Sequence, residues 1–156
     1  SDQAHAGCDG CRARPRSRRP HRAGFMIIGI GSDLCDVRRI EKTLARFGQR
    51  FVDRVFTDVE QRKSDRRAER AASYAKRFAA KEAIVKALGT GFAHGIWIRD
   101  VGIAPNAWGR PEVIWSERGR ALRDRLGAGE GHVTLTDEAG LVVAVAVLMK
   151  RVEQVQ

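Results

Sequence analysis

The sequence has few cysteines, few aromatic side chains and no long apolar segment. Two of its three cysteines lie within the first eleven residues, which leaves too few for the disulfide framework of a small secreted domain. Aromatic residues make up 6% of the 156-residue chain, a poor supply of stacking surface for a nucleic-acid-binding protein. The longest apolar run, Leu141–Met149, is too short to span a bilayer. These absences favour one domain in the reducing cytoplasm.

Positive charge, in contrast, is abundant and unevenly distributed. The formal net charge is +10, and the segment from Arg38 to Lys86 carries 15 basic and seven acidic residues. A field of this kind attracts a polyanion, such as a nucleic acid, a membrane surface, a phosphorylated ligand or an acidic protein. A well-solvated surface is the alternative explanation, and charge alone does not choose among these.

Residues 1–25 lack the periodicity of a helix or a strand. Six arginines alternate there with small residues, so we expect an unfolded leader ahead of one domain, residues 26–156. An organelle-targeting leader is an alternative. Two cysteines and two histidines of this segment could gather around zinc, although their irregular spacing is a weak match to structural zinc sites: His5, Cys8, Cys11 and His21.

The folded part is predicted to begin with an apolar strand, Met26–Leu34. Its alternation places Gly29, Gly31 and Asp33 on one face, so that bare backbone lies beside a carboxylate. Apolar residues on both faces predict a central strand. A dinucleotide-binding G-x-G-x-x-G fingerprint is excluded, because Leu34 occupies its sixth position.

An amphipathic helix with a basic outer face is expected next. Asp36 is a candidate N-cap, apolar positions recur at helical spacing up to Phe47, and Gly48 ends the helix. Both plain solvation and a docking surface explain the basic face. Its side chains are Arg38, Arg39, Lys42 and Arg46, continued by Arg50.

The longest helix is predicted from about residue 71 to 88, before the turn Gly89-Thr90-Gly91. Glu82 lies near the middle of its apolar stripe. An unpaired carboxylate removed from water costs several kcal/mol, so Glu82 needs a partner. A salt bridge to Lys86, four residues further on, and a bound cation are two explanations, and protonation with a raised pKa is a third.

Asp33 favours the cation. It ends a strand beside two glycines, a position where mixed α and β folds often bind ligands. Two carboxylates from separate elements suit Mg²⁺ that carries a phosphorylated ligand, because magnesium usually takes one or two protein carboxylates and fills its remaining positions with phosphate oxygens and water. Nearby lysines would pair with the other phosphate oxygens.

The C-terminal half is predicted to be rich in strands, with a helix at about residues 116–126. His132, Thr134 and Thr136 alternate with apolar residues and form the polar face of one strand. The strand candidates are Ile96–Ile103, Pro111–Trp115, His132–Thr136 and Leu141–Met149.

Three motifs carry a resemblance: the strand Ile28–Asp33, the turn Phe56–Glu60, and Arg77–Gly91 with the sequence RFAAKEAIVKALGTG. Together they resemble the holo-acyl-carrier-protein synthase family, the small group I 4′-phosphopantetheinyl transferases. The match runs from Met26 to about Leu148. It implies an α+β fold in which a small, mainly antiparallel sheet packs against a long helix and shorter helices. It also implies a homotrimer with active sites between subunits.

The resemblance further implies a reaction. The 4′-phosphopantetheine arm of coenzyme A moves to a serine of apo acyl carrier protein, and adenosine 3′,5′-bisphosphate is released. Asp33 and Glu82 would hold Mg²⁺, and Lys86 would act with them in catalysis near the pyrophosphate. The resemblance places Lys86, Gly89, Gly91 and His132 beside the coenzyme. Lys81, which flanks Glu82, and Thr134, on the strand of His132, are the other predicted coenzyme contacts. The basic face of the first helix would dock the acidic carrier protein.

Two other classes of function stay open. A basic nucleic-acid-binding domain would use the positive charge, but the sequence has no recognised nucleic-acid motif and this function leaves Glu82 unexplained. A non-catalytic adaptor for an acidic protein would share the fold without needing the metal. The sequence also departs from the family at Thr134, where serine is common, and at Asp137, where histidine or serine is common.

Overall fold

Five strands and five helices make up residues 26–152, the part of the chain that the computed structural model describes. No helix among these residues is both long and apolar enough to cross a bilayer. The Arg-rich leader and its four candidate zinc-binding residues lie outside the described residues. In chain order the elements are β1 (Ile27–Asp36), α1 (Val37–Phe47), α2 (Gln49–Val55), α3 (Asp58–Asp65), α4 (Arg70–Leu88), the short 3₁₀ helix η1 (Ile98–Asp100), β2 (Val101–Pro105), β3 (Pro111–Trp115), α5 (Glu117–Arg125), β4 (Ala128–Glu138) and β5 (Leu141–Lys150).

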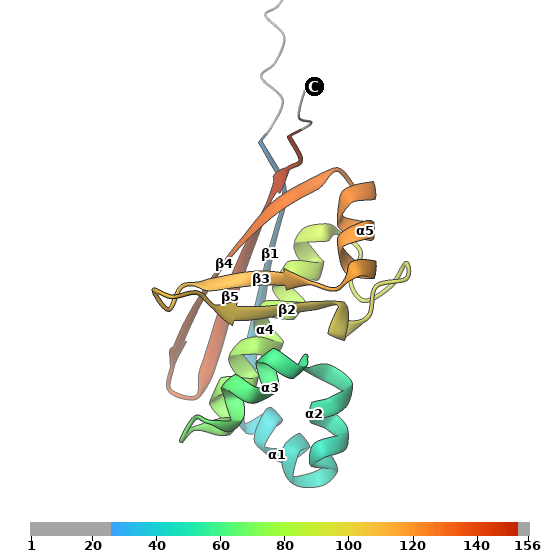
Figure 1. The fold of residues 1–156 in the computed structure, drawn as a ribbon. Coiled ribbons are helices and arrows are strands. Elements are labelled where there is room, and N and C mark those ends of the chain that lie inside the picture. Colours follow the sequence, from blue (N-terminus) through green and yellow to red (C-terminus); the bar gives the residue numbers. More distant parts are fainter. Residues whose placement is uncertain (1–25, 153–156) are drawn as a thin grey trace, which may run out of the picture.

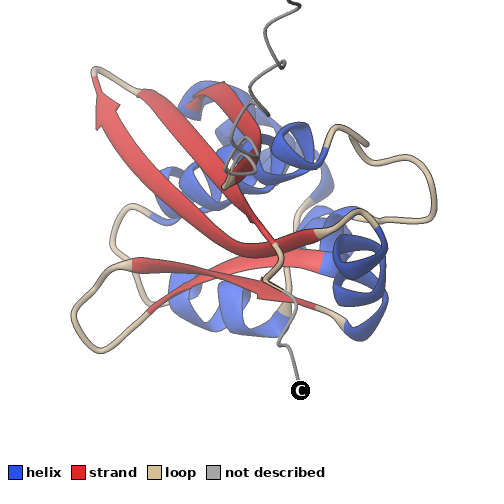
Figure 2. Ribbon diagram, turned by 90° about the horizontal axis from the view of Figure 1, so that it is seen from above, coloured by secondary structure: helices blue, strands red, loops and turns tan. Residues whose placement is uncertain are grey.

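The strands form one antiparallel sheet in the order β1-β5-β4-β3-β2, and the predicted α+β class is confirmed. The long helix α4 packs on β1, β5 and β4, while α1, α2 and α3 gather at one end of the molecule (Figure 1). The β2–β3 hairpin runs across the long strands β1, β4 and β5. The view from above shows that it diverges from the β4–β5 hairpin (Figure 2). The sheet is therefore strongly twisted.

Two glycines let β1 and α4 approach each other closely. A Cβ atom at Gly29 would meet the carbonyl oxygen of Ala87 at 1.8 Å, and one at Gly31 would meet that of Ala83 at 2.0 Å. Glycine is required here because a side chain would occupy space that the helix backbone fills. The predicted alternation is confirmed, since Gly31 is buried while Ile30 is exposed. This contact brings the end of β1 against the last turns of α4.

The predicted central position of β1 is wrong. Among the described residues β1 pairs only with β5 and is an edge strand. The apolar side chains on its outer face are not covered within one chain, because α4 covers only the inner face. Ile28, Ile30 and Leu34 are 42%, 66% and 58% exposed.

The predicted helix ends are confirmed where local hydrogen bonds define them. Asp36 accepts a hydrogen bond from the backbone N–H of Arg38 and caps α1. Thr57 and Glu60 form the reciprocal capping box of α3. Gly89 ends α4 with a φ of 77°, in the left-handed region that glycine adopts without strain.

Two predictions about the elements need correction. The helix α4 is buried on most of its sides instead of along one stripe, because the sheet covers one side and the α3–β2 layer another. The predicted strand Ile96–Ile103 begins as loop and as η1, and β2 starts only at Val101. The Asp100 carboxylate causes this turn by accepting hydrogen bonds from the Trp97 N–H and the Ser116 hydroxyl.

Candidate active site

Asp33, Glu82 and Lys86 meet where β1 crosses the last turns of α4. The Lys86 ammonium donates hydrogen bonds to Asp33 Oδ1 at 2.8 Å and to the carbonyl oxygen of Ser32 at 3.1 Å. Glu82 precedes Lys86 by one helical turn and so lies on the same side of α4. The Asp33 side chain is 16% exposed and that of Lys86 is 49% exposed. The cluster therefore borders solvent and is accessible to a ligand.

The two carboxylates influence each other electrostatically. Burial raises the pKa of Glu82, the negative charge of Asp33 raises it further, and Lys86 opposes the shift. The hydrogen bond to Asp33 raises the pKa of Lys86, which keeps the lysine charged. The site thus combines two mutually repelling carboxylates with a single ammonium group.

The Glu82–Lys86 ion pair considered above is not what the structure contains. Among the ion pairs of the described residues, the partner of Lys86 is Asp33. Glu82 is left partly buried beside another negative charge, which is an unfavourable arrangement that a cation would relieve.

The donor set fits Mg²⁺. Asp33 and Glu82 supply hard oxygen ligands from two separate elements, as magnesium prefers. No group of three or more His, Cys, Asp or Glu side chains suited to a metal occurs within residues 26–152. Asp33 and Glu82 alone would therefore hold the ion, and its other positions would be open to phosphate oxygens and water.

Lys81 does not face this site. Its side chain is fully buried, and its ammonium lies 2.7 Å from Glu60 Oε2. Burial lowers the pKa of Lys81, and the neighbouring Glu60 carboxylate opposes that shift. Because successive helical residues point about 100° apart, Lys81 and the adjacent Glu82 serve different sides of α4. The structure therefore removes Lys81 from the set of residues predicted to contact the coenzyme.

His132 and Thr134 also lie apart from the carboxylates within one chain. The sheet register pairs His132 with Val147 and Thr134 with Val145 on the outer face of the sheet. Asp33 pairs with Ala144 on the inner face, against α4. The two groups of predicted residues are thus on opposite faces of the same sheet. The remaining two, Gly89 and Gly91, lie in the turn that ends α4, with φ of 77° and 56°.

Arg110 is a neighbour of His132 that the sequence did not reveal. Its guanidinium Nη2 lies 3.1 Å from His132 Nδ1, and both residues line a surface pocket of about 300 Å³ with Thr134. Nothing in the sequence indicated that Arg110 lies beside His132, because the two residues meet only through the pairing of β3 with β4, in which Glu112 lies opposite His132.

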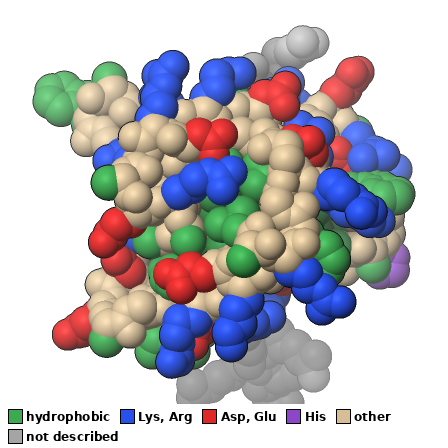
Figure 3. All heavy atoms as spheres, turned by 90° about the horizontal axis from the view of Figure 1, so that it is seen from below, with side chains coloured by type: hydrophobic (Ala, Val, Ile, Leu, Met, Phe, Trp, Pro, Cys, Tyr) green, Lys and Arg blue, Asp and Glu red, His purple; other side chains and the backbone are tan. Residues whose placement is uncertain are grey.

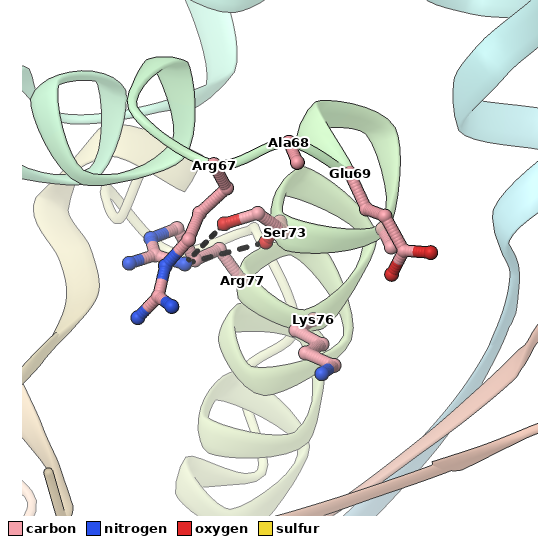
Figure 4. A pocket seen from close by; sticks show the side chains of 7 residues that line it. Arg67, Ala68, Glu69, Ser73, Lys76 and Arg77 are labelled. Carbon is pink, nitrogen blue, oxygen red and sulfur yellow. Dashed lines mark hydrogen bonds between the residues drawn. The ribbon is translucent and has the colours of Figure 1, made fainter.

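A larger pocket, of about 570 Å³, opens at the N-terminal end of α4 (Figure 4). Arg77 is 9% exposed, its Nη1 donates to Ser73 Oγ at 2.9 Å, and its Nε has no hydrogen-bond partner. Burial lowers the pKa of Arg77, the nearby Glu60 opposes this, and Arg67 reinforces it. Two neighbouring guanidinium groups, of which that of Arg77 has an unused donor, suit an anion. The position of Arg77 within RFAAKEA was the available signal.

The predicted basic face lies on the end of the molecule formed by α1 and α2, and all five of its side chains are exposed. In the view from below, Lys and Arg side chains border an apolar area, with several Asp and Glu side chains among them (Figure 3). Phe47 and Phe51 contribute apolar surface to a pocket of about 610 Å³, together with Arg50 and Arg54. Arg38 also forms an ion pair with the N-cap residue of α1, with its Nη2 atom 2.6 Å from Asp36 Oδ2.

The chain belongs to the 4′-phosphopantetheinyl transferase superfamily, whose family model matches residues 29–146. Within that class it is similar to holo-[acyl-carrier-protein] synthases. The one from Brucella ovis is 53% identical over 127 residues, which are 79% of this chain and 95% of that protein. The predicted resemblance is confirmed.

Solved structures of such synthases share the fold. The enzyme of Neisseria meningitidis aligns with a TM-score of 0.76 at 34% identity, over 80% of this chain and 100% of that chain. The Helicobacter pylori enzyme, in complex with coenzyme A, aligns with a TM-score of 0.68 at 28% identity, over 76% of this chain and 98% of that chain.

Proposed function

We propose that this chain transfers the 4′-phosphopantetheine arm of coenzyme A to a serine of apo acyl carrier protein, with adenosine 3′,5′-bisphosphate as the second product. The observation that carries the proposal is the solvent-accessible cluster of Asp33, Glu82 and Lys86, in which two mutually repelling carboxylates lie beside the lysine ammonium. The names of the similar proteins support the same reaction. The scarcity of cysteine supports a cytoplasmic location.

Asp33 and Glu82 would hold Mg²⁺, which when bound neutralises negative charge on the coenzyme pyrophosphate. Lys86 is half-exposed and could turn from Asp33 toward the departing phosphate oxygen. The carrier serine oxygen bonds to the phosphorus of the phosphopantetheine arm, and the bridging bond to the adenosine phosphate breaks. The serine proton passes to a water or a carboxylate of this cluster. The Arg67–Arg77 pocket is available for another phosphate group of the coenzyme.

The direct test is a transfer assay. The full chain is incubated with coenzyme A, Mg²⁺ and an apo acyl carrier protein, and the carrier is weighed by mass spectrometry. The expected result is a carrier heavier by one phosphopantetheine group, only when coenzyme A and Mg²⁺ are both present. An unchanged mass with several different carriers would contradict the proposed function.

A homotrimer is the second part of the proposal. Apolar side chains of β1 and β5 are exposed on the outer face of the sheet, and a second copy would cover them: Ile28, Ile30, Leu34, Leu141 and Val143. The separation of His132 from Glu82 by the sheet supports active sites built from two subunits. One subunit would supply Asp33, Glu82 and Lys86, and its neighbour would supply His132, Thr134 and Arg110.

Subunit mixing tests this arrangement. The variants Glu82→Gln and His132→Ala are each expected to be weakly active, because each damages every site of its own homotrimer. After unfolding and refolding together, mixed trimers should recover activity, since some interfaces combine an intact Glu82 with an intact His132. As a control, Glu82→Gln mixed with Asp33→Asn should recover nothing, because both changes fall in the same half-site. Mixed trimers without recovered activity would refute shared sites.

Charge reversal on α1 tests carrier docking. Arg39→Glu combined with Lys42→Glu should raise the KM for the acidic carrier about tenfold and leave the KM for coenzyme A nearly unchanged, because rim charges act mainly on association. The matched control reverses two exposed arginines of α5, Arg120 and Arg125, and changes the net charge equally. Equal effects of the two variants, or a parallel rise in the KM for coenzyme A, would show that the docking surface lies elsewhere.

A further inference from the structure

A fully buried ion pair joins α4 to the elements on the side away from β1. Lys81 and Glu60 each have 0% side-chain exposure, and Lys81 Nζ lies 2.7 Å from Glu60 Oε2. We call this pair and its hydrogen bonds the buried hub. The other partners are backbone groups of α2, η1, the α3 N-cap and β2: the carbonyl oxygens of Val55 and Ile98, and the N–H groups of Thr57 and Ile103.

Every donor and acceptor of the buried hub is used. The Lys81 ammonium donates to Glu60, to Val55 at 2.7 Å and to Ile98 at 3.1 Å. Glu60 also accepts hydrogen bonds from Thr57 and Ile103, at 2.9 and 3.0 Å. Directional contacts from four elements, α2, α3, η1 and β2, therefore converge at one point of α4. Stability alone explains such a pair poorly, because the desolvation cost of two buried charges offsets much of their attraction.

Small groups make much of the contact between α4 and the sheet. On the β1 side the helix backbone rests on Gly29 and Gly31, without a side chain between them. Much of its buried surface is alanine: Ala75, Ala79, Ala80, Ala83 and Ala87. Flat contacts between small residues hold two elements together, but they lack the ridges that interlock larger side chains. Tyr74, Ile84 and Val85 interlock with their neighbours on other parts of the helix. The directional hydrogen bonds of Lys81 add a constraint on rotation directly beside Glu82.

Rotation of α4 matters because Glu82 follows Lys81 directly. A side-chain head group lies roughly 6 Å from the axis of a helix, so a rotation of about 10° would move the Glu82 carboxylate by about 1 Å. A displacement of that size is enough to reduce a reaction rate by about a hundredfold. The same rotation would alter the distance between Glu82 and Asp33, which face each other across the contact of α4 with β1.

We infer that Lys81 and Glu60 are positioning residues that set the rotation of α4 and thereby hold Glu82 against Asp33. Neither side chain reaches the site, since both are fully enclosed. Their effect passes through the helix backbone to the next residue. This inference rests on the proposed transferase activity. It gives a role to the buried Lys81, which was predicted from the sequence to contact the coenzyme.

The test replaces both charges by apolar side chains of similar size, Glu60→Leu with Lys81→Met. The double replacement leaves no unpaired buried charge. It does leave the backbone groups of Val55, Ile98, Thr57 and Ile103 without their partners, so activity is measured well below the thermal midpoint of the variant. We expect a lower thermal midpoint and, at a temperature where the variant is folded, a kcat lower by about 10- to 100-fold with an unchanged KM for the carrier. We also expect Mg²⁺ alone to raise the thermal midpoint less than it does in wild type.

Leu122→Ala provides the control for stability. Leu122 is buried in α5 and is neither a member of the hub nor a residue of the candidate site, so this variant should melt earlier and retain the wild-type kcat. A Glu60→Leu, Lys81→Met variant with wild-type kcat and a wild-type Mg²⁺ response would overturn the inference. If that variant does not fold, Glu60→Gln with Lys81→Gln is measured by the same readouts and judged by the same outcomes. Absence of transfer by the wild-type chain would instead refute the proposed function, and the Mg²⁺ response would still test the positioning.

Discussion

Glu82→Gln is expected to lower the kcat of phosphopantetheine transfer by about a thousandfold. The amide keeps the size of the side chain but removes the charge that would bind Mg²⁺, and one electrostatic partner of a transition state contributes about this much. Steady-state transfer of the coenzyme arm to an apo carrier measures the loss. Binding of the carrier should persist, which separates a catalyst from an adaptor. Glu138→Gln, an exposed carboxylate at the end of β4, is the control and should match wild type.

The same variant should be more stable than wild type in the absence of metal. Burial and Asp33 raise the pKa of Glu82 above its ordinary value of 4.5, so the folded chain binds this proton more tightly than the unfolded chain does. The stability of wild type therefore falls as the pH rises from the ordinary pKa through the raised one, and the penalty is complete above it. Glutamine removes the penalty at neutral pH and has no such advantage below the ordinary pKa.

Thermal unfolding in a chelating buffer, measured across that pH range, checks the sign. The midpoint of Glu82→Gln should exceed that of wild type at pH 7 and approach it at low pH. Mg²⁺ should raise the wild-type midpoint and leave that of the variant nearly unchanged. A variant that is less stable than wild type at neutral pH without metal would mean that Glu82 is satisfied by the protein alone.

Gly31→Ala is expected to destabilise the fold by about 3 kcal/mol and to reduce transfer by about a hundredfold. The new Cβ atom would meet the Ala83 carbonyl oxygen at 2.0 Å and the Ala87 nitrogen at 2.6 Å, and both are backbone atoms of α4. The helix can accept the methyl group only by moving away from β1. That movement separates Glu82 from Asp33, so stability and activity fall together.

Urea unfolding and the transfer assay measure the two effects. Ser32→Ala, at the next residue of the same strand, adds no atom between β1 and α4, because Ser32 points to the outer face, and it should leave the transfer rate unchanged. A Gly31→Ala variant as stable and as active as wild type would mean that α4 can move from β1 without consequence, and the account of the close contact would be wrong.

Features that depend on a few neighbouring residues were predictable from the sequence. The caps at Asp36 and Thr57 and the turn at Gly89 follow from side chains within four residues of the helix ends. The alternation of Gly29, Gly31 and Asp33 along β1 follows from the pleat of a strand. Local hydrogen bonding and strand geometry determine these features, and no distant contact is needed to define them.

Features that depend on which surfaces meet were predicted poorly. The apolar residues on both faces of β1 indicated a central strand, but β1 lies at the edge of the sheet. The sequence cannot distinguish these cases, because an apolar face has the same pattern whether its own chain or the proposed second copy covers it. Lys81 was predicted to contact the coenzyme because it lies beside Glu82 in the sequence, whereas its partner Glu60 lies 21 residues earlier in the chain. Arg77 was overlooked for a related reason, since only the packing of α4 reveals its unpaired donor.

The sequence by itself determined most of the elements, the family and the residue types of the proposed magnesium and phosphate site, because these follow from short motifs and from the chemistry of single side chains. Only the tertiary structure decided which of those residues meet. It brings Asp33 to Glu82 through the glycine contact with α4, it encloses Lys81 with Glu60, and it separates His132 from both by a sheet. The physical reason is that packing selects one side of each helix and strand, and that selection depends on contacts between segments far apart in the chain.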